Sequence, residues 1–599
     1  MDPLRELSIT VSGIDLGVIA IYLVGIVVAG VVMTKMASRN IDSYFLGGRK
    51  MPWWLLGLSG TASYFDVTGV MWTIAFFYTM GPRFFWIQWE WGFLATACFA
   101  TFMGKWLRRT GVMTGAEWME VRFGGDAAGE FARFSYAVMA VVIAVAFIGF
   151  AEYGCGRFLH SFIPSWSPHS LAVCLMAFTA IYTITSGLYG VVLTGAIQFA
   201  IILLGSGILI YKAVSISSYE TIAESMPPEW FGFWPMWHWE HLENWELTGS
   251  YSLFFLVALV WVAKGTFLSL GGPQQLYDMQ RFLAARNPRE ASKAGLTWGV
   301  ALTPMFMVSA AVGVIGIMQW GGGLEHPDRL YPVVIGTMLP VGVKGLVLAG
   351  LLSAFMSTFS ATVNAGASYL IRDGYQKVAR PDASDRELKW ASRAASLLLV
   401  IAGIWVGMQA TNIDDIFNWI MMILGTAVLM PNVLRWFWWR FNGWGFAVGT
   451  LTGVAAAIIA VTCFADVPLY VSFFVLLIIS SLSSVLSTLL TRPTDMETLV
   501  EFYRRVHPPG LWGPVKKKVF ADKNFEQKDS FAMDLVAAII IAIGLQALFL
   551  ASVYACTQQW TAFGVSLLTV AASGVISYWT WYRALPDENE NVVQDIMSK

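Results

Sequence analysis

The chain has 599 residues, of which 57 % are hydrophobic and 13 % are charged, with a formal net charge of −1 and a mean hydropathy of +0.61. Soluble proteins carry about 25 % charged residues, so this composition excludes a soluble enzyme, a disordered chain and a disulfide scaffold. The balanced charge offers no basic face for nucleic acid. An all-α polytopic membrane protein remains.

Long apolar runs set the expected span count and orientation. A bilayer core takes about 20 residues of helix, and positively charged loops stay in the cytoplasm. Lysine and arginine gather in the connections after odd-numbered runs, including Arg281 after the seventh. We therefore expect the N-terminus outside and the C-terminus in the cytoplasm. About fifteen runs meet the length rule: 13–35, 52–80, 83–107, 132–156, 168–189, 191–213, 249–274, 293–319, 343–372, 388–410, 413–438, 443–465, 467–490, 531–555 and 560–582.

The second and seventh runs contain helix breakers. Residues 57–69 combine three glycines and several hydroxyls with Asp66, and residues 264–273 combine Lys264 with glycines and Pro273. Because the two interruptions lie five spans apart, they predict two five-helix repeats with inverted topology. Paired broken helices predict a site for a cation and a solute at the membrane midplane. The alternative is two ordinary kinked helices, since glycine is frequent in membrane helices.

Polar side chains inside these runs are candidates for solute contact. A charge within a span costs about 2.5–3.5 kcal/mol on insertion scales. Asp66 and Lys264 therefore either neutralise each other as an ion pair or contact the solute or the ion. Gln88 and Glu90 in the third run are deep enough to line the same cavity.

The Trp- and Glu-rich connection at 214–248 differs from the basic loops. It contains no lysine or arginine, but six glutamates and five tryptophans. Aromatic rings favour the membrane–water interface, so we expect an outer loop that lies on the membrane. A lid over the solute site is the alternative.

The ninth run carries a small oxygen cluster. Ala354, Ser357 and Thr358 stand at i, i+3 and i+4 and therefore share one helix face. Two hydroxyls beside a backbone carbonyl suit a dehydrated Na⁺, if a broken helix opposite adds its carbonyls. The alternative is that these hydroxyls bond only to their own helix.

The last third of the chain adds a basic linker and two further spans. The chain has no phosphate loop of the GxxxxGK[ST] type. Uphill transport would therefore draw on an ion gradient or the membrane potential.

Several spaced motifs follow one another along the chain. They are Tyr-Phe-Leu-Gly-Gly-Arg at 44–49, Pro-Trp-Trp at 52–54, Gly-Leu-Tyr-Gly-Val-Val at 187–192, Thr-Gly-Ala-Ile-Gln at 194–198, Gln-Arg-Phe-Leu-Ala-Ala-Arg at 280–286, Gly-Leu-Leu-Ser-Ala-Phe-Met-Ser-Thr at 350–358, Asn364, and Arg-Asp-Gly-Tyr at 372–375. In this order they resemble the sodium:solute symporter family, which includes sodium–sugar, sialic acid, proline, pantothenate and iodide transporters. The resemblance covers roughly residues 14–490.

The resemblance implies a LeuT-type fold that works by alternating access, with Na⁺ as the coupling ion. The family's shared sodium site combines backbone carbonyls of the first core helix with an Ala-x-x-Ser-Ser/Thr group. The matching positions are the carbonyls of Ala62 and Phe65, together with Ala354, Ser357 and Thr358.

Three departures from the family pattern bear on the sites. Gly195 stands where several members carry an aspartate linked to a second sodium or to sodium release, which puts that sodium in doubt. Asp66 stands where many members have a small residue. The sugar transporters have polar residues at the positions of Thr68, Gly69 and Gln88, but Gly69 offers no side chain. The candidate solute-binding residues are therefore Asp66, Thr68, Gln88 and Lys264.

The expected organisation has seven parts in chain order. They are an extra helix and its loop (1–51), the first five-helix repeat (52–213), the Trp/Glu-rich loop (214–248), the second, inverted repeat (249–438), two additional helices (439–490), the cytoplasmic linker (491–530), and two C-terminal helices with a tail (531–599).

The expected function is a sodium-coupled symporter in a plasma membrane, where the short tails and unpaired cysteines favour a bacterial inner membrane. Its partners are the sodium ion, a small polar organic solute and the lipid bilayer, with no nucleic acid. A sugar or sugar-related solute is favoured. The alternatives are a proton-coupled or sodium-independent transporter of an organic acid or amino acid, and a solute sensor that does not transport. A channel or a membrane enzyme is disfavoured, and the sequence does not determine the oligomeric state.

Overall fold

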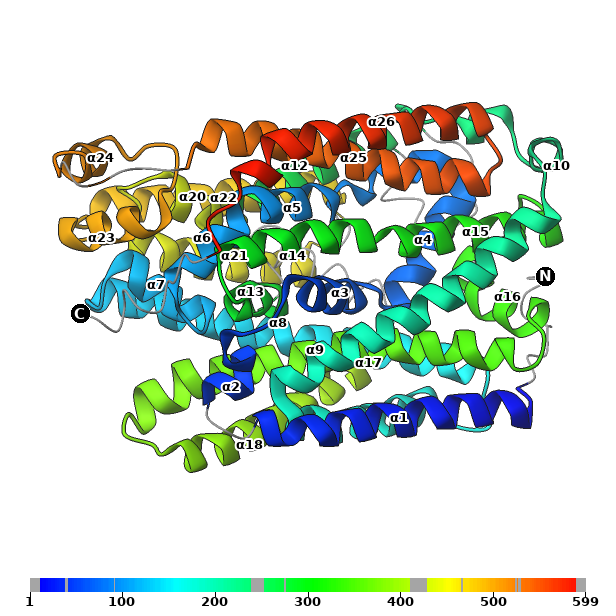
Figure 1. Cartoon of the computed structure of the whole chain (residues 1–599), viewed down its shortest axis with the longest axis horizontal. Helices are drawn as coiled ribbons and strands as arrows, with labels where there is room; N and C mark the ends of the chain where they lie inside the picture. The colour runs from blue at the N-terminus through cyan, green and yellow to red at the C-terminus, as the bar shows by residue number, and fades with distance from the viewer. Residues whose placement is uncertain are drawn as a thin grey trace.

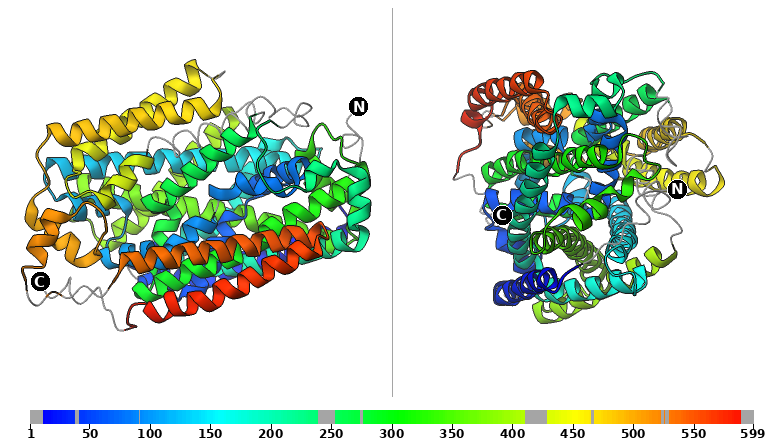
Figure 2. Two further views of the ribbon diagram at one scale, coloured as in Figure 1. Left: turned by 90° about the horizontal axis from the view of Figure 1, so that it is seen from above. Right: turned by 90° about the vertical axis from the view of Figure 1, so that its right-hand side faces the viewer.

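The chain folds into a bundle of helices that run mostly along one axis (Figures 1 and 2). The computed structural model describes residues 11–588 except 38–40, 91, 239–252, 274–275, 410–427, 465–466, 523–524 and 526–528. Within these residues the structure is helical and forms no strand. Its helices are α1 (Gly13–Ala37), α2 (Ile41–Leu46), α3 (Trp53–Tyr64), α4 (Val67–Met80), α5 (Phe93–Cys98), α6 (Gly104–Thr110), α7 (Gly115–Phe123), α8 (Ala127–His160), α9 (Pro168–Ile216), α10 (Tyr219–Ser225), α12 (Phe254–Gly271), α13 (Leu276–Ala284), α14 (Pro288–Ala301), α15 (Thr303–Trp320), α16 (Leu330–Met338), α17 (Val343–Tyr369), α18 (Asp385–Gln409), α20 (Leu429–Phe437), α21 (Gly443–Cys463), α22 (Leu469–Leu490), α23 (Met496–Val506), α24 (Gly513–Val519), α25 (Phe531–Cys556) and α26 (Trp560–Thr580).

Eleven helices of the described chain are long and apolar enough to cross a membrane. The expected count of fifteen is not confirmed. In the fifth run only a shorter apolar helix, Pro168–Ile181, is present within the described residues. The second and third runs are divided into pieces shorter than a full span, as in α3 and α4. Most of the run at 413–438 lies outside the described residues.

In both interrupted runs a helix ends within the motif, but the first ends in the middle of its motif and the second near the end. In the first, Phe65 and Asp66 leave helical geometry between α3 and α4. In the second, α12 continues through Lys264 and ends at Gly271, one residue before Gly272 with φ 96°. Proline cannot supply the N–H that would continue the helix, so Pro273 fixes the end of α12.

A sharp reversal divides α9 into two segments. Its 49 residues would span roughly 74 Å if straight, far more than a bilayer. Gly187 has φ 53° and ψ −152°, a conformation open to glycine, and a Cβ there would lie 2.5 Å from the carbonyl of Tyr44. The expected break between 189 and 191 therefore falls at Gly187.

The core of the bundle is α17, which packs against α1, α3, α8 and α9. In the most apolar stretch of Val343–Ala379, which contains α17, 94 % of the residues are buried. In the corresponding stretch of Trp560–Ala584, which contains α26, 17 % are buried. Figure 2 shows α25 and α26 along one flank and α21 and α22 along another. The end of α3 and the face of α17 therefore meet deep inside the protein.

Part of the Trp- and Glu-rich connection is packed into the protein. Trp230 is fully buried, and its indole N–H donates to the carbonyl of Tyr78 at 2.9 Å, at the end of α4. Trp234 and Trp237 are 71 % and 63 % exposed. Trp230 thus differs from the expected interfacial position because a backbone carbonyl accepts its N–H inside the fold. Trp239 and Trp245 lie outside the described residues.

Several basic residues counted as loop charges are also buried. Arg122 is fully buried and donates to the carbonyls of Arg435 and Trp438 at 2.9 and 3.0 Å. Its guanidinium lies 4.8 Å from the ring centroid of Trp512 in the linker. Arg122 thereby joins α7 to the linker at the end of the bundle where α23 and α24 lie (Figure 1).

Candidate sodium and solute site

The break in α3 exposes backbone oxygens beside α17. A helix leaves its last four carbonyls without an N–H partner in the same helix, and α3 ends at Tyr64. Thr358 Oγ1 donates to the carbonyl of Ser63 at 2.7 Å and to that of Ala354 at 3.3 Å. The Oγ atoms of Ser357 and Ser63 lie 3.3 Å apart. The structure therefore brings the α3 break and the α17 hydroxyls together.

The residues at this junction fit a sodium ion. Ala62 and Ala354 are fully buried, and Phe65 and Ser357 are 3 % and 1 % exposed. Their carbonyl and hydroxyl oxygens are hard, neutral ligands, and the C-terminal end of α3 carries a partial negative charge that favours a cation. Thr358 uses its hydroxyl proton as a donor, which leaves the oxygen lone pairs available for a cation.

Asp66 caps the second half of the broken helix. Its Oδ1 accepts from the backbone N–H of Gly69 at 2.7 Å, as the N-cap residue of α4. Within the described residues, no ion pair joins Asp66 to Lys264. Asp66 is half-buried. One of its two carboxylate oxygens, Oδ1, is occupied by the N-terminal end of α4.

Lys264 and Gln88 lie on contacting elements. The turn at Gln88–Glu90 packs against α12, which carries Lys264. Lys264 Nζ is 4.9 Å from the ring centroid of Trp261, and that ring is 6.2 Å from Trp72 of α4. Gln88 is 2 % exposed, and neither amide atom has a hydrogen-bond partner among the described residues.

Thr68 is oriented towards α8. It is 8 % exposed, and its Oγ1 lies where a side chain on Gly154 would stand. Gly195, the departure noted above, packs against α3, since a Cβ there would be 2.8 Å from Ser59 Oγ. The close approach of α9 and α3 leaves little room for a larger residue at position 195.

Sequence reasoning missed the role of two charged residues at the junction. Arg281 resembles a loop charge in the sequence, but it is 2 % exposed and its Nη2 donates to Ser63 Oγ at 2.6 Å. Asp278, one turn earlier, accepts from Tyr64 Oη at 2.7 Å. The available signal was a carboxylate two residues before the QRFLAAR motif and a guanidinium three residues after that carboxylate, within the motif.

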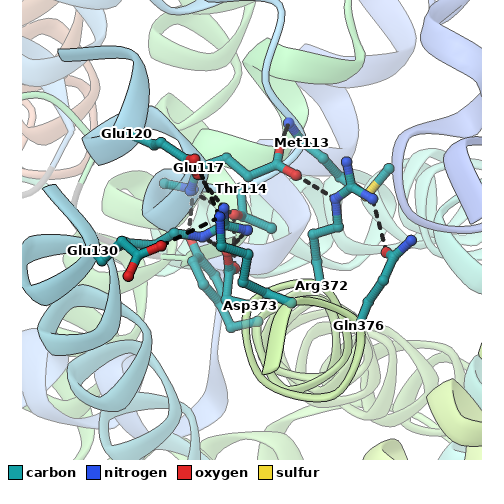
Figure 3. A network of polar contacts seen from close by, with 12 residues as sticks. Met113, Thr114, Glu117, Glu120, Glu130, Arg372, Asp373 and Gln376 are labelled. Carbon is teal, nitrogen blue, oxygen red and sulfur yellow. Dashed lines mark hydrogen bonds and ion pairs between the residues drawn. The ribbon is translucent and has the colours of Figure 1, made fainter. Parts of the chain in front are cut away.

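A network of charged groups holds Leu370–Ala379, the helical segment that continues α17. Asp373 accepts from Arg133 Nε and from Thr114 Oγ1, both at 2.8 Å. Arg372 pairs with Glu117 and donates to Gln376 at 2.7 Å. Figure 3 shows Arg372 and Asp373 directed towards the segment that carries Thr114 and Glu117. The network ties α17 to α7 and α8.

Comparison with known proteins places these features in one family. A family model described as the sodium:solute symporter family matches residues 44–453. The chain belongs to the sodium:solute symporter family. The match spans both broken helices and the hydroxyl cluster of α17. The family resemblance seen in the sequence is confirmed.

The sequence relatives are transporters. A sodium/glucose cotransporter 4 from Danio rerio is 26 % identical over 512 residues, which cover 75 % of this chain and 72 % of the relative. A sodium/glucose cotransporter from Vibrio parahaemolyticus is 25 % identical over 487 residues, which cover 75 % of this chain and 85 % of the relative. The expectation of a membrane transporter rather than an enzyme is confirmed, with sodium as the coupling ion.

A solved structure supports the fold. A sodium-coupled sialic acid symporter in a substrate-bound, outward-open state aligns with a TM-score of 0.65 and 19 % identity, over 81 % of this chain and 99 % of that chain. At this identity the likeness concerns the fold. The all-α, LeuT-type architecture is thereby confirmed.

Proposed function

We propose that this member of the family imports a sugar or sugar-related solute across a plasma membrane together with sodium. The contact of Thr358 and Ser357 with the broken end of α3 carries the proposal. In it, sodium is bound by the carbonyls of Ala62 and Phe65 and by the oxygens of the Ala354, Ser357 and Thr358 group.

The solute site in this proposal lies between α4 and α12. Asp66, Thr68, Gln88 and Lys264 are its candidate contacts. The amide of Gln88, which has no hydrogen-bond partner among the described residues, offers a donor and an acceptor to solute hydroxyls. Trp72 and Trp261 supply aromatic surface beside them. The sodium/glucose relatives support a sugar, whereas Lys264 would also suit the carboxylate of a sugar acid.

Alternating access follows from differential binding. Sodium at the junction holds α3 against α17 and favours the outward-open state, in which the solute enters between the broken helices. Joint occupancy then permits closure and opening to the cytoplasm. Each ligand shifts the equilibrium only by its preference for one state over the other.

Thermal unfolding of the purified protein in NaCl and in choline chloride tests the sodium site. A ligand at 100 times its Kd stabilises by about 2.7 kcal/mol, so we expect a higher unfolding temperature in NaCl. Ser357→Ala and Thr358→Ala should need a higher sodium concentration for the same effect. Ser368→Ala is the matched control, because Ser368 lies on α17 and its hydroxyl donates to the carbonyl of Ala365 in the same helix at 2.6 Å.

Two results would contradict the proposal. One is a wild-type protein that sodium does not stabilise, which would favour proton coupling through Asp66. The other is an unchanged sodium dependence in both variants. Adding sugars, sugar acids and amino acids in turn identifies the solute class, because the correct solute stabilises further in sodium.

A further inference from the structure

Two side chains of α13 hold the end of α3. Asp278 and Arg281, one helical turn apart, are 0 % and 2 % exposed. Tyr64 Oη donates to Asp278 Oδ2 at 2.7 Å, and Arg281 Nη2 donates to Ser63 Oγ at 2.6 Å. Helix α13, which follows α12 in the second interrupted run, therefore contacts two consecutive residues at the end of α3.

Both residues that α13 contacts lie between the backbone carbonyls that we propose bind sodium. Ser63 and Tyr64 stand between Ala62 and Phe65 in the last turn of α3. Ser63 also accepts from Thr358 of α17 through its carbonyl. Any movement of α13 relative to α3 is thus transmitted to the backbone that carries the proposed sodium ligands.

The contacts are polar groups set among aromatic rings. The ring of Trp298 lies 5.1 Å from that of Tyr64, edge to face, and 5.7 Å from the guanidinium of Arg281. Asp278 Oδ1 is buried and has no hydrogen-bond partner among the described residues. Apolar side chains would join two helices at this depth at lower cost, so a half-satisfied carboxylate calls for a functional explanation.

We propose that the Tyr64–Asp278 and Ser63–Arg281 contacts form a latch that couples sodium occupancy to the second broken helix. The inference rests on the proposed sodium site. Asp278 and Arg281 act as positioning residues, because they touch the backbone segment between the ligands rather than the ion. Sodium fixes the last turn of α3, and the latch then fixes α13. Because coupling is reciprocal, opening the latch weakens sodium binding.

Tyr64→Phe tests the latch, since it removes one hydroxyl and keeps the ring against Trp298. We expect the sodium concentration that gives half of the thermal stabilisation to rise by roughly tenfold, the effect of losing one hydrogen bond to a charged group. Tyr78→Phe is the matched control. It removes a buried hydroxyl from α4, where Tyr78 Oη accepts from the N–H of Leu324 at 3.2 Å, and should leave the sodium dependence unchanged.

Variants of Asp278 separate coupling from mere stability. Asp278→Asn keeps an acceptor for Tyr64 and should retain most of the sodium affinity, whereas Asp278→Ala should resemble Tyr64→Phe. A structural role alone would lower the unfolding temperature in choline chloride without moving the half-saturating sodium concentration.

The outcomes distinguish this inference from the proposal beneath it. Absence of any sodium effect in the wild type overturns the sodium site itself. A normal wild-type response with an unchanged sodium dependence in Tyr64→Phe and Asp278→Ala overturns the latch alone. If either variant does not fold, Arg281→Lys provides the same test, because a lysine cannot reproduce the contacts of the guanidinium with both Ser59 and Ser63. An unchanged sodium dependence in Arg281→Lys also overturns the latch.

Discussion

Asp66 shows how one residue can serve both the fold and the transported ligands. Its Oδ1 caps α4 through the N–H of Gly69, which is a structural role. Its position next to the carbonyl of Phe65 places a negative charge beside the proposed cation. The two roles make different demands, because capping needs an acceptor oxygen whereas cation or solute binding needs the charge.

Asp66→Asn therefore separates these roles. Asparagine is as good an N-cap as aspartate, so we expect a folded protein with a nearly unchanged unfolding temperature in choline chloride. Transport should be abolished or strongly weakened because the charge is lost. Asp66→Ala should additionally lose about 1 kcal/mol of stability with the cap. Uptake measured in both variants checks this, and wild-type uptake by Asp66→Asn would restrict the residue to capping.

At the scale of elements, the carboxylate of Asp529, 12 % exposed, helps to attach the basic linker to the core. Asp529, just before α25, pairs with Lys105 at 3.4 Å and with Arg109, and lies 3.5 Å from His507 Nδ1. Burial alone would raise the pKa of Asp529. The hydrogen bond from His507 and the charges of Lys105 and Arg109 outweigh burial and hold this pKa well below its usual range. The carboxylate therefore joins α6, α23 and α25.

Asp529→Asn should lower the free energy of unfolding by roughly 2 kcal/mol at neutral pH, because it removes charged hydrogen bonds that Asp529 accepts from Arg109 and Lys105. Lys105 retains its ion pair with Asp534 at 2.8 Å. A depressed carboxylate pKa contributes stability above the unfolded-state pKa, roughly 3.9, and this contribution is lost as pH falls through the folded-state value. The difference between variant and wild type should thus shrink in acid.

Thermal unfolding as a function of pH measures this difference. Asp522→Asn is the control, since Asp522 pairs with Arg504 at 2.8 Å through side chains that are 35 % and 45 % exposed. Exposed pairs contribute about 0–1 kcal/mol. An Asp529→Asn variant as stable as Asp522→Asn would show that the linker is held by its apolar contacts alone.

At the scale of the whole molecule, the sequence predicted features that depend on local pattern. The breakers in 57–69 located the first interruption, and the i, i+3, i+4 spacing of Ala354, Ser357 and Thr358 placed one oxygen face on one helix. Both follow from helix geometry alone. The family and the LeuT-type architecture followed from spaced motifs.

Features that depend on long-range packing could not be predicted in this way. Arg281 and Arg122 follow apolar runs and resemble loop charges in the sequence, yet both are buried because carbonyls or hydroxyls of distant helices accept their N–H groups. Trp230 is buried for the same reason. The end of α12 likewise falls at the far end of its motif, at Gly271, rather than at Lys264.

The most direct test of the account is radioactive sodium entry into proteoliposomes that contain the purified protein, measured with and without each solute of a panel of sugars, sugar acids and amino acids. The account predicts that one class, with sugars favoured, stimulates sodium entry, and that uptake of the same solute is lost in choline chloride. Solute uptake that proceeds equally in choline chloride, or sodium entry that no solute stimulates, would contradict sodium-coupled symport by this protein.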